Sequence, residues 1–190
     1  MLEVRPNLTW RDVQGVLIRS AKPINPSDSD WSMNGASLRV NHKYGFGRLD
    51  CAQAVTTARE WNLLGPEVSS RIADSASRPI PDNNAAGIEV VLAIPDDIVV
   101  ESIEVSVMAA HGFRGQLWLA IDSPMGTRSV LQEPHNDYSS GIYWTYTSMR
   151  HWGEGSRGAW RFTISDRVPG IVGSLQSVML SVYGHARSSA

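Results

Sequence analysis

The chain has 190 residues, a formal net charge of −2 at pH 7, 42% hydrophobic and 19% charged residues, and one cysteine. The charge argues against a nucleic-acid partner, because proteins that bind polyanions usually display an excess of lysine and arginine. The single cysteine, Cys51, excludes an internal disulfide and a thiolate cluster for zinc or an iron–sulfur centre.

Two short helices are predicted in the first third of the chain. Thr9 and Asp12 form a variant of the capping box, so a helix is expected to start at Trp10, and Pro23 ends it near Lys22. Asp50 begins a second capped helix that extends to about Trp61. The apolar positions with helical spacing are Trp10, Val13, Val16 and Leu17 in the first helix, and Ala54, Val55, Ala58 and Trp61 in the second. These stripes are too small for an independent core, so residues 1–64 are expected to need cover from another part of a protein.

The next segment predicts a domain boundary. Residues 65–87 read GPEVSSRIADSASRPIPDNNAAG, which is the composition of a linker or a loosely held edge, and we predict a linker there. The hydrophobic period then changes to two, as in Ile103, Val105 and Val107, and again in AWRFTIS and SVMLSVYG. No helical period follows Trp61. Residues 88–186 are therefore predicted to form an antiparallel β-sandwich or jelly roll, and the fold class is mainly β.

No catalytic constellation is visible in the residues themselves. The chain lacks a G-x-S-x-G elbow, a zincin helix and a P-loop. A surface or loop-anchoring role is expected for the five histidines, which are His42, His111, His135, His151 and His185. Carboxylates that end strands or lie in loops suit turn capping, although such oxygens also suit calcium or a glycosidase acid pair. These carboxylates are Asp96, Asp97, Asp122, Asp137, Glu154 and Asp166. We assign no catalytic residue and no cofactor-binding residue, and we leave metal ligands unassigned.

No apolar run reaches the roughly 18 residues needed to cross a bilayer, so no transmembrane segment is expected. The N-terminal MLEVRPNLTW also lacks the basic and apolar regions of a signal peptide.

Several stretches occur together in one order: NLTWRDVQGVL, DWSMNG, HKYGFGRLDCAQAV, RGQLWLAIDSPMGTRSVL, HNDYSSGIYWTYTSMRHWGEGSRGAWRFTISD and LSVYG. In their residues and their order along the chain, these stretches resemble the kexin and furin type of subtilisin-like proprotein convertase. The resemblance implies that residues 1–64 correspond to the end of the catalytic domain and residues 88–186 to the P domain (Homo B), a jelly roll that stabilises that domain. It also implies a secreted, periplasmic or secretory-pathway protein whose parent enzyme cleaves polypeptides after basic residues.

The same resemblance places the chemistry elsewhere. The family's Asp, His and Ser triad and its principal calcium ligands match no residue of this chain, and its G-T-S-A serine motif is absent. The expected partner is therefore the missing catalytic domain, and calcium is expected only at the level of the family. The chain also has Gly115, Gln116 and Leu117 where family members often have Gly-Asp-Leu, which removes any role of that acid.

Two other hypotheses remain open. A stand-alone β-sandwich could display Trp118, Trp144 or Trp152 to a carbohydrate or a protein. A degenerate subtilisin that kept only this portion would act as a scaffold, and its helical stripes would then be covered. If the helices instead lack the sheet of the catalytic domain that would cover them, residues 1–64 are expected to be sensitive to proteases and residues 88–186 to be resistant.

Overall fold

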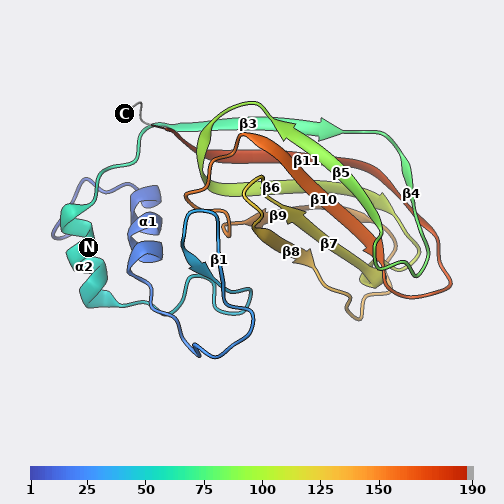
Figure 1. Cartoon of the computed structure of the whole chain (residues 1–190), viewed down its shortest axis with the longest axis horizontal. Coiled ribbons are helices and arrows are strands. Elements are labelled where there is room, and N and C mark those ends of the chain that lie inside the picture. The colour runs from blue at the N-terminus through green and yellow to red at the C-terminus, as the bar shows by residue number, and fades with distance from the viewer. Residues whose placement is uncertain (188–190) are drawn as a thin grey trace. The chain divides into compact units, whose positions relative to one another are not determined.

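The computed structural model describes residues 1–187 and divides the chain into two compact units, the first spanning Met1–Pro66 and the second beginning at Glu67. Figure 1 shows helices in the first unit and strands in two layers in the second. No described helix is long and apolar enough to cross a membrane.

The first unit contains helix α1 (Trp10–Ser20), helix α2 (Cys51–Glu60) and a two-stranded sheet of β1 (Ser32–Met33) and β2 (Arg39–Val40). The capping box that starts α1 is confirmed: the Thr9 hydroxyl accepts a hydrogen bond from the Asp12 N–H, and the Asp12 carboxylate accepts one from the Thr9 N–H at 2.8 Å. Asp50 caps α2 by accepting from the Gln53 N–H at 2.9 Å.

The helices share a small core. Leu8, Val16, Ala54 and Ala58 are buried, and Met1, Val13 and Trp61 pack against them. The placement of Trp10 in the buried stripe is wrong, since 66% of its surface is exposed. At about 100° per residue, Trp10 lies about 120° around the helix from Val16 and therefore outside the contact.

Asp12 connects the helices as well as capping one of them. It is fully buried, and its Oδ1 atom accepts hydrogen bonds from Trp61 Nε1 at 2.9 Å and from the Leu64 N–H at 2.8 Å. Burial raises the pKa of this carboxyl, but the hydrogen bonds from Thr9, Leu64 and Trp61 outweigh burial and hold the pKa below its usual value.

The second unit is an antiparallel β-sandwich, as predicted. One sheet has the order β5-β10-β7-β8, the other has the order β3-β11-β6-β9, and β4 pairs with β11. The strands are β3 (Glu67–Asp74), β4 (Arg78–Ile80), β5 (Ile88–Ile94), β6 (Ile98–Ala110), β7 (Leu117–Asp122), β8 (Arg128–Gln132), β9 (Ile142–Ser148), β10 (Gly158–Asp166) and β11 (Gly173–Ala186). A 3-10 helix, η1 (Arg114–Gln116), precedes β7.

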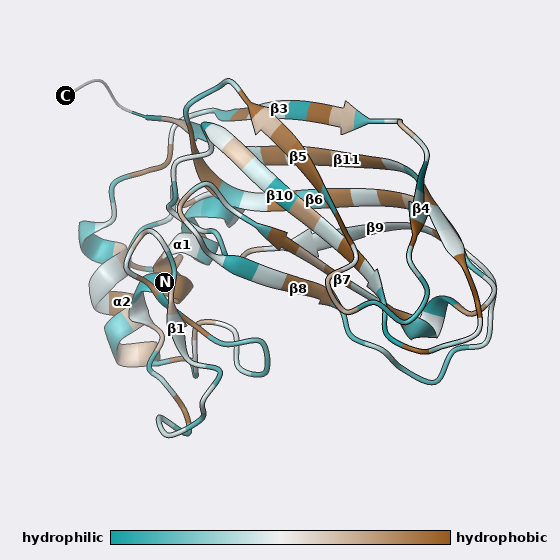
Figure 2. Ribbon diagram, turned by 45° about the vertical axis from the view of Figure 1, so that its right-hand side comes forward, coloured by the Kyte–Doolittle hydropathy of each residue, from teal (hydrophilic) through white to brown (hydrophobic). Residues whose placement is uncertain are grey.

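The core of this unit lies between the two sheets. Alternate side chains of each strand face inward, and Trp160, Phe162 and Ile164 of β10 are fully buried there. Trp160 satisfies its buried N–H by donating to the Ser156 carbonyl at 2.9 Å. Figure 2 shows apolar residues concentrated in the strands.

The linker expected over residues 65–87 requires correction, because β3 and β4 lie within it. Strand β3 pairs with β11 from Glu67 opposite His185 to Asp74 opposite Val178. Its composition misleads because an edge strand is held mainly by backbone hydrogen bonds, which polar residues form as well as apolar ones. Only Ser70 of β3 is buried, so the composition is that of an edge strand.

Candidate functional site

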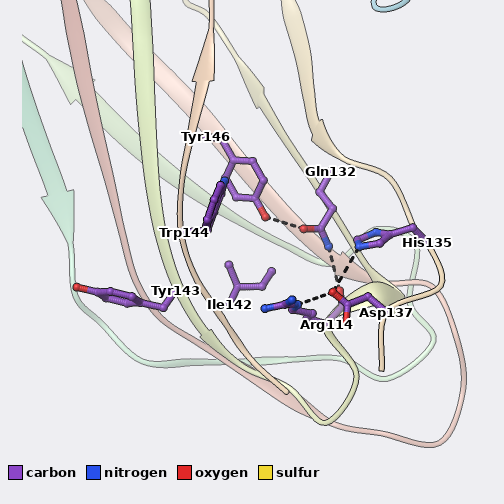
Figure 3. Close-up of a pocket in the computed structure, with 8 residues that line it drawn as sticks. All are labelled: Arg114, Gln132, His135, Asp137, Ile142, Tyr143, Trp144 and Tyr146. Carbon is purple, nitrogen blue, oxygen red and sulfur yellow. Dashed lines mark hydrogen bonds and ion pairs between the residues drawn. The ribbon is translucent and has the colours of Figure 1, made fainter. Parts of the chain in front are cut away.

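A pocket of about 290 Å³ opens beside the edge strand β9 and is the candidate functional site. Strand β9 supplies one wall, strand β8 and the loop after it supply another, and η1 lies at its end (Figure 3). Its lining consists of Arg114, Gln132, His135, Asp137, Ile142, Tyr143, Trp144 and Tyr146.

An ion pair fixes the polar end of the pocket. Arg114 Nε donates to Asp137 Oδ2 at 2.7 Å, and Asp137 Oδ1 accepts from the Ser139 N–H at 2.8 Å. The Ser139 hydrogen bond and the Arg114 guanidinium lower the pKa of Asp137 to about 2. Asp137 is therefore a carboxylate whose two oxygens are already engaged.

Gly115 positions this ion pair. A Cβ atom at residue 115 would collide with the backbone carbonyls of His135 and Asp137. The Gly115 N–H donates to the Asp137 carbonyl at 3.0 Å, and the His135 N–H donates to the Gly115 carbonyl at 2.8 Å. The loop can therefore approach η1 this closely only because residue 115 has no side chain.

Gln132 connects the two walls. Its amide nitrogen donates to the carbonyls of Arg114 at 2.9 Å and Leu117 at 3.1 Å, and its oxygen accepts from the Tyr146 hydroxyl at 2.6 Å. Burial raises the pKa of the Tyr146 hydroxyl, which therefore remains protonated at neutral pH. Gln132 and Tyr146 thus maintain the shape of the pocket.

Other groups are available to a ligand. The terminal nitrogens of Arg114 have no hydrogen-bond partner among residues 1–187. The His135 ring is half exposed, with Nδ1 2.9 Å from the Glu133 carbonyl oxygen. Trp144 is 65% exposed and Tyr143 is 86% exposed. A guanidinium end beside aromatic surfaces is suited to binding a ligand.

The structure places the five histidines apart from one another. His42 lies 2.9 Å from Asp30 in the first unit, and His185 lies 2.7 Å from Glu101 in the second. Of the others, His135 borders the pocket, while His111 and His151 are buried and hold loops to the sandwich. The surface or loop-anchoring role expected for the histidines stays a prediction, and His185 lies within strand β11 rather than in a loop.

Two buried polar groups were not apparent from the sequence patterns. His111 Nε2 lies 3.2 Å from Asp166 Oδ2, and both side chains are fully buried. His151 Nε2 lies 3.2 Å from the Thr127 carbonyl oxygen, and the Thr127 hydroxyl donates to Glu154. Burial lowers the pKa of His151 to about 4, so its ring is neutral at pH 7.

Each of the candidate loop carboxylates has a protein partner. Asp96 accepts from the Ser70 hydroxyl, Asp97 pairs with Arg187, Asp122 with Arg128, Asp137 with Arg114 and Asp166 with His111, while Glu154 accepts from Thr127. Within residues 1–187 no group of three or more His, Cys, Asp or Glu side chains is arranged to hold a metal ion. The calcium expected at the level of the family is therefore not assigned to any side chain of residues 1–187.

Of the three tryptophans considered for ligand display, only Trp144 is displayed. Trp152 is 5% exposed, and the half-buried Trp118 ring lies under Arg167, whose guanidinium carbon is 4.7 Å from the ring centroid. The aromatic surface of the candidate site thus comes from β9.

Comparison with known proteins identifies the second unit. Residues 100–182 match the family model described as the proprotein convertase P-domain. The chain is 32% identical over 174 residues to PC3-like endoprotease variant B of Hydra vulgaris. This alignment covers 87% of the chain and 24% of the relative. It is 29% identical over 205 residues to the dibasic-processing endoprotease of Schizosaccharomyces pombe, covering 98% of this chain and 29% of the relative.

Furin of Rattus norvegicus is 32% identical over 197 residues, with 97% of this chain and 24% of the relative covered. Among solved structures, the serine protease of Aeromonas sobria in complex with its chaperone has a TM-score of 0.90 at 21% identity, and the match covers 98% of this chain and 42% of that one. The chain thus spans less than a third of the length of these curated relatives. It carries a proprotein convertase P domain and is related, over most of its length, to the furin- and kexin-like proprotein convertases.

Proposed function

We propose that this chain is the C-terminal part of a kexin-like serine endopeptidase, in which its P domain stabilises a subtilisin-like catalytic domain. The observation that carries the proposal is the P-domain match at residues 100–182 within a wider similarity to dibasic-processing and furin-like endoproteases. The parent enzyme would cleave polypeptides after basic residues by acyl transfer through a Ser-His-Asp triad. The residues of this chain would not take part in that chemistry.

The sizes of the two cores support this division of roles. The sandwich has a continuous core to which both sheets contribute, whereas the core cluster of the first unit contains four buried apolar side chains, Leu8, Val16, Ala54 and Ala58. A unit with so little buried apolar surface is marginal by itself. We infer that residues 1–64 complete a catalytic domain and that the sandwich supplies stability of its own.

The calcium and the location implied by the family form part of the proposal. We propose that any calcium the parent enzyme requires is held by other segments, since no group of three or more His, Cys, Asp or Glu side chains within residues 1–187 is arranged to hold a metal ion, and Asp122 and Asp137 are engaged with arginines. We also propose a route through the secretory pathway or the periplasm, by analogy with the convertases.

The proposal is tested with a fluorogenic peptide that ends in Lys-Arg. The 190-residue chain and the product of the longest reading frame that contains it are assayed side by side. The longer product is expected to cleave the peptide, and the chain alone is expected to be inactive. Cleavage by the purified chain alone, or an inactive longer product that is correctly folded, would contradict the proposal.

A further inference from the structure

Strand β9 has an open edge. It pairs with β6 from Ile142 opposite Ala109 to Ser148 opposite Ile103, and no other described strand pairs with it. Near its end the strand approaches β8, where the hydroxyl oxygens of Ser148 and Ser129 lie 2.8 Å apart. Residues 142–145 therefore present unpaired backbone N–H and C=O groups at alternate positions, which is the arrangement that another strand can join.

This edge lacks the protection that the other edges have. Strand β9 reads IYWTYTS, with no charged residue and no proline, and its pairing with β6 has no bulge. By contrast, β3 carries Glu67, Arg71 and Asp74, β5 carries Glu89, and β8 carries Arg128 and pairs through a bulge. Charges, prolines and bulges usually prevent edge-to-edge pairing. Their absence from β9 marks this edge as one that is compatible with a partner strand.

Hollows lie on both sides of the same strand. The pocket in Figure 3 lies on one side, and a second hollow of about 440 Å³ lies over the outer surface of the sheet. Met108 and Met179 line the second hollow, and Tyr143 and Trp144 line both. Side chains of an added strand would point alternately to the two faces, so each hollow can receive its own set.

The charges of the two hollows differ. In the first, Asp137 is engaged by Arg114 Nε and the Ser139 N–H, while the terminal Arg114 nitrogens face the pocket without a partner among residues 1–187. The second hollow is lined by uncharged residues, among them Ala73, Ser106 and Met108. Charge complementarity thus favours an acidic side chain in the first hollow and an apolar one in the second.

We propose that the edge formed by residues 142–145 binds an extended polypeptide segment that adds a strand to β9, with an acidic side chain beside Arg114 and apolar side chains over Met108 and Tyr143. The backbone hydrogen bonds between the added strand and β9 would supply affinity, and the two hollows would select the side chains of the bound segment. This interaction surface goes beyond the proposed function and does not depend on the catalytic domain.

The test uses the full 190-residue chain and a peptide capped at both ends, acetyl-Thr-Val-Asp-Val-Thr-Val-Thr-amide. Isothermal titration calorimetry is expected to give saturable binding, and amide chemical shifts in NMR are expected to change along β9. Two N-methylated versions carry methyl groups on complementary alternate amides. In a strand added to β9, only every second residue directs its N–H and C=O groups to β9. The version methylated at those amides should bind at least tenfold more weakly, and the version methylated at the other amides should bind as the unmethylated peptide does. Equal effects of both sets, or no binding at about 1 mM peptide, would overturn the proposal.

Matched variants separate the contributions of the two hollows. R114Q is expected to reduce affinity for the aspartate peptide at least fivefold and to reduce affinity for an asparagine version by a smaller factor; equal reductions would contradict a charge interaction with Arg114. W144A is expected to weaken both peptides. Trp10, 66% exposed on α1 against 65% for Trp144, provides the control W10A, which should bind as the unmodified chain does. Circular dichroism and thermal melting verify that each variant is folded. A loss of binding in W10A equal to that in W144A would contradict the assignment.

Discussion

The replacement F162A tests whether the sandwich supplies stability of its own. Phe162 is fully buried in β10, within the core between the sheets. Truncation of a buried phenylalanine to alanine costs about 3–5 kcal/mol, through lost burial and the cavity that remains. Against the total of about 5–15 kcal/mol that is typical of a domain, this change removes a large part of the stability. It should lower the melting temperature of the sandwich by roughly 10–20 °C.

The assay is thermal and urea unfolding of the 190-residue chain, followed by far-UV circular dichroism. The matched control is V91A: Val91 lies on the neighbouring strand β5, opposite Arg161, but is 51% exposed, so its truncation should cost less than about 1 kcal/mol. In the longer protein, F162A should also reduce the yield of active enzyme, while V91A should not. A melting temperature in F162A equal to that of V91A would refute the reasoning, and so would an undiminished yield of active enzyme.

Three further predictions concern other parts of the chain. The pKa of His151 is lowered to about 4 in the folded protein. Between about pH 6.5 and pH 4 the His151 ring is therefore protonated in the unfolded chain but neutral in the folded chain. Stability should therefore fall by about 3 kcal/mol as the pH decreases through that window, and urea unfolding of H151Q should show a flatter dependence. G115A should displace the loop that carries Asp137 and shift the NMR signals of Asp137 and Ser139, because the added Cβ meets backbone carbonyls; unchanged loop signals would contradict this. In hydrogen exchange, the amides of α1 and α2 should exchange faster than those of β6 and β11, and equal protection would favour a scaffold with a covered first unit.

The sequence was sufficient for features that depend on local patterns. The capping residues Thr9 and Asp50 mark the start of both helices, because each cap is formed within three residues of the chain. Alternation in AWRFTIS indicates which side of β10 is buried, since side chains in any strand alternate between the two faces. In these cases the physical cause is local in the sequence, so no knowledge of the tertiary structure is needed.

Other features depend on which strands become neighbours, and composition does not reveal this. The polar residues of β3 suit a linker and an edge strand equally well, and only its pairing with β11 distinguishes the two. Likewise, the approach of His111 to Asp166, 55 residues later, depends on the path of the chain around the sandwich. Trp10 shows a similar limit on a smaller scale, because helical spacing defines a stripe but not how far the partner helix extends across it.

The candidate site combines both kinds of feature. In YWTYT the alternation predicts a half-buried strand, yet Tyr143 and Trp144 are both largely exposed. The reason is that β9 lies at the edge of its sheet: Ile142 and Tyr146 still contact the core between the sheets, whereas Tyr143 and Trp144 border the two hollows and remain exposed. A pattern of period two indicates two faces but not whether each is covered. Because evolution usually equips an uncovered strand with charge or proline, the aromatic and uncharged character of residues 142–145 is better explained by a partner strand than by solvent.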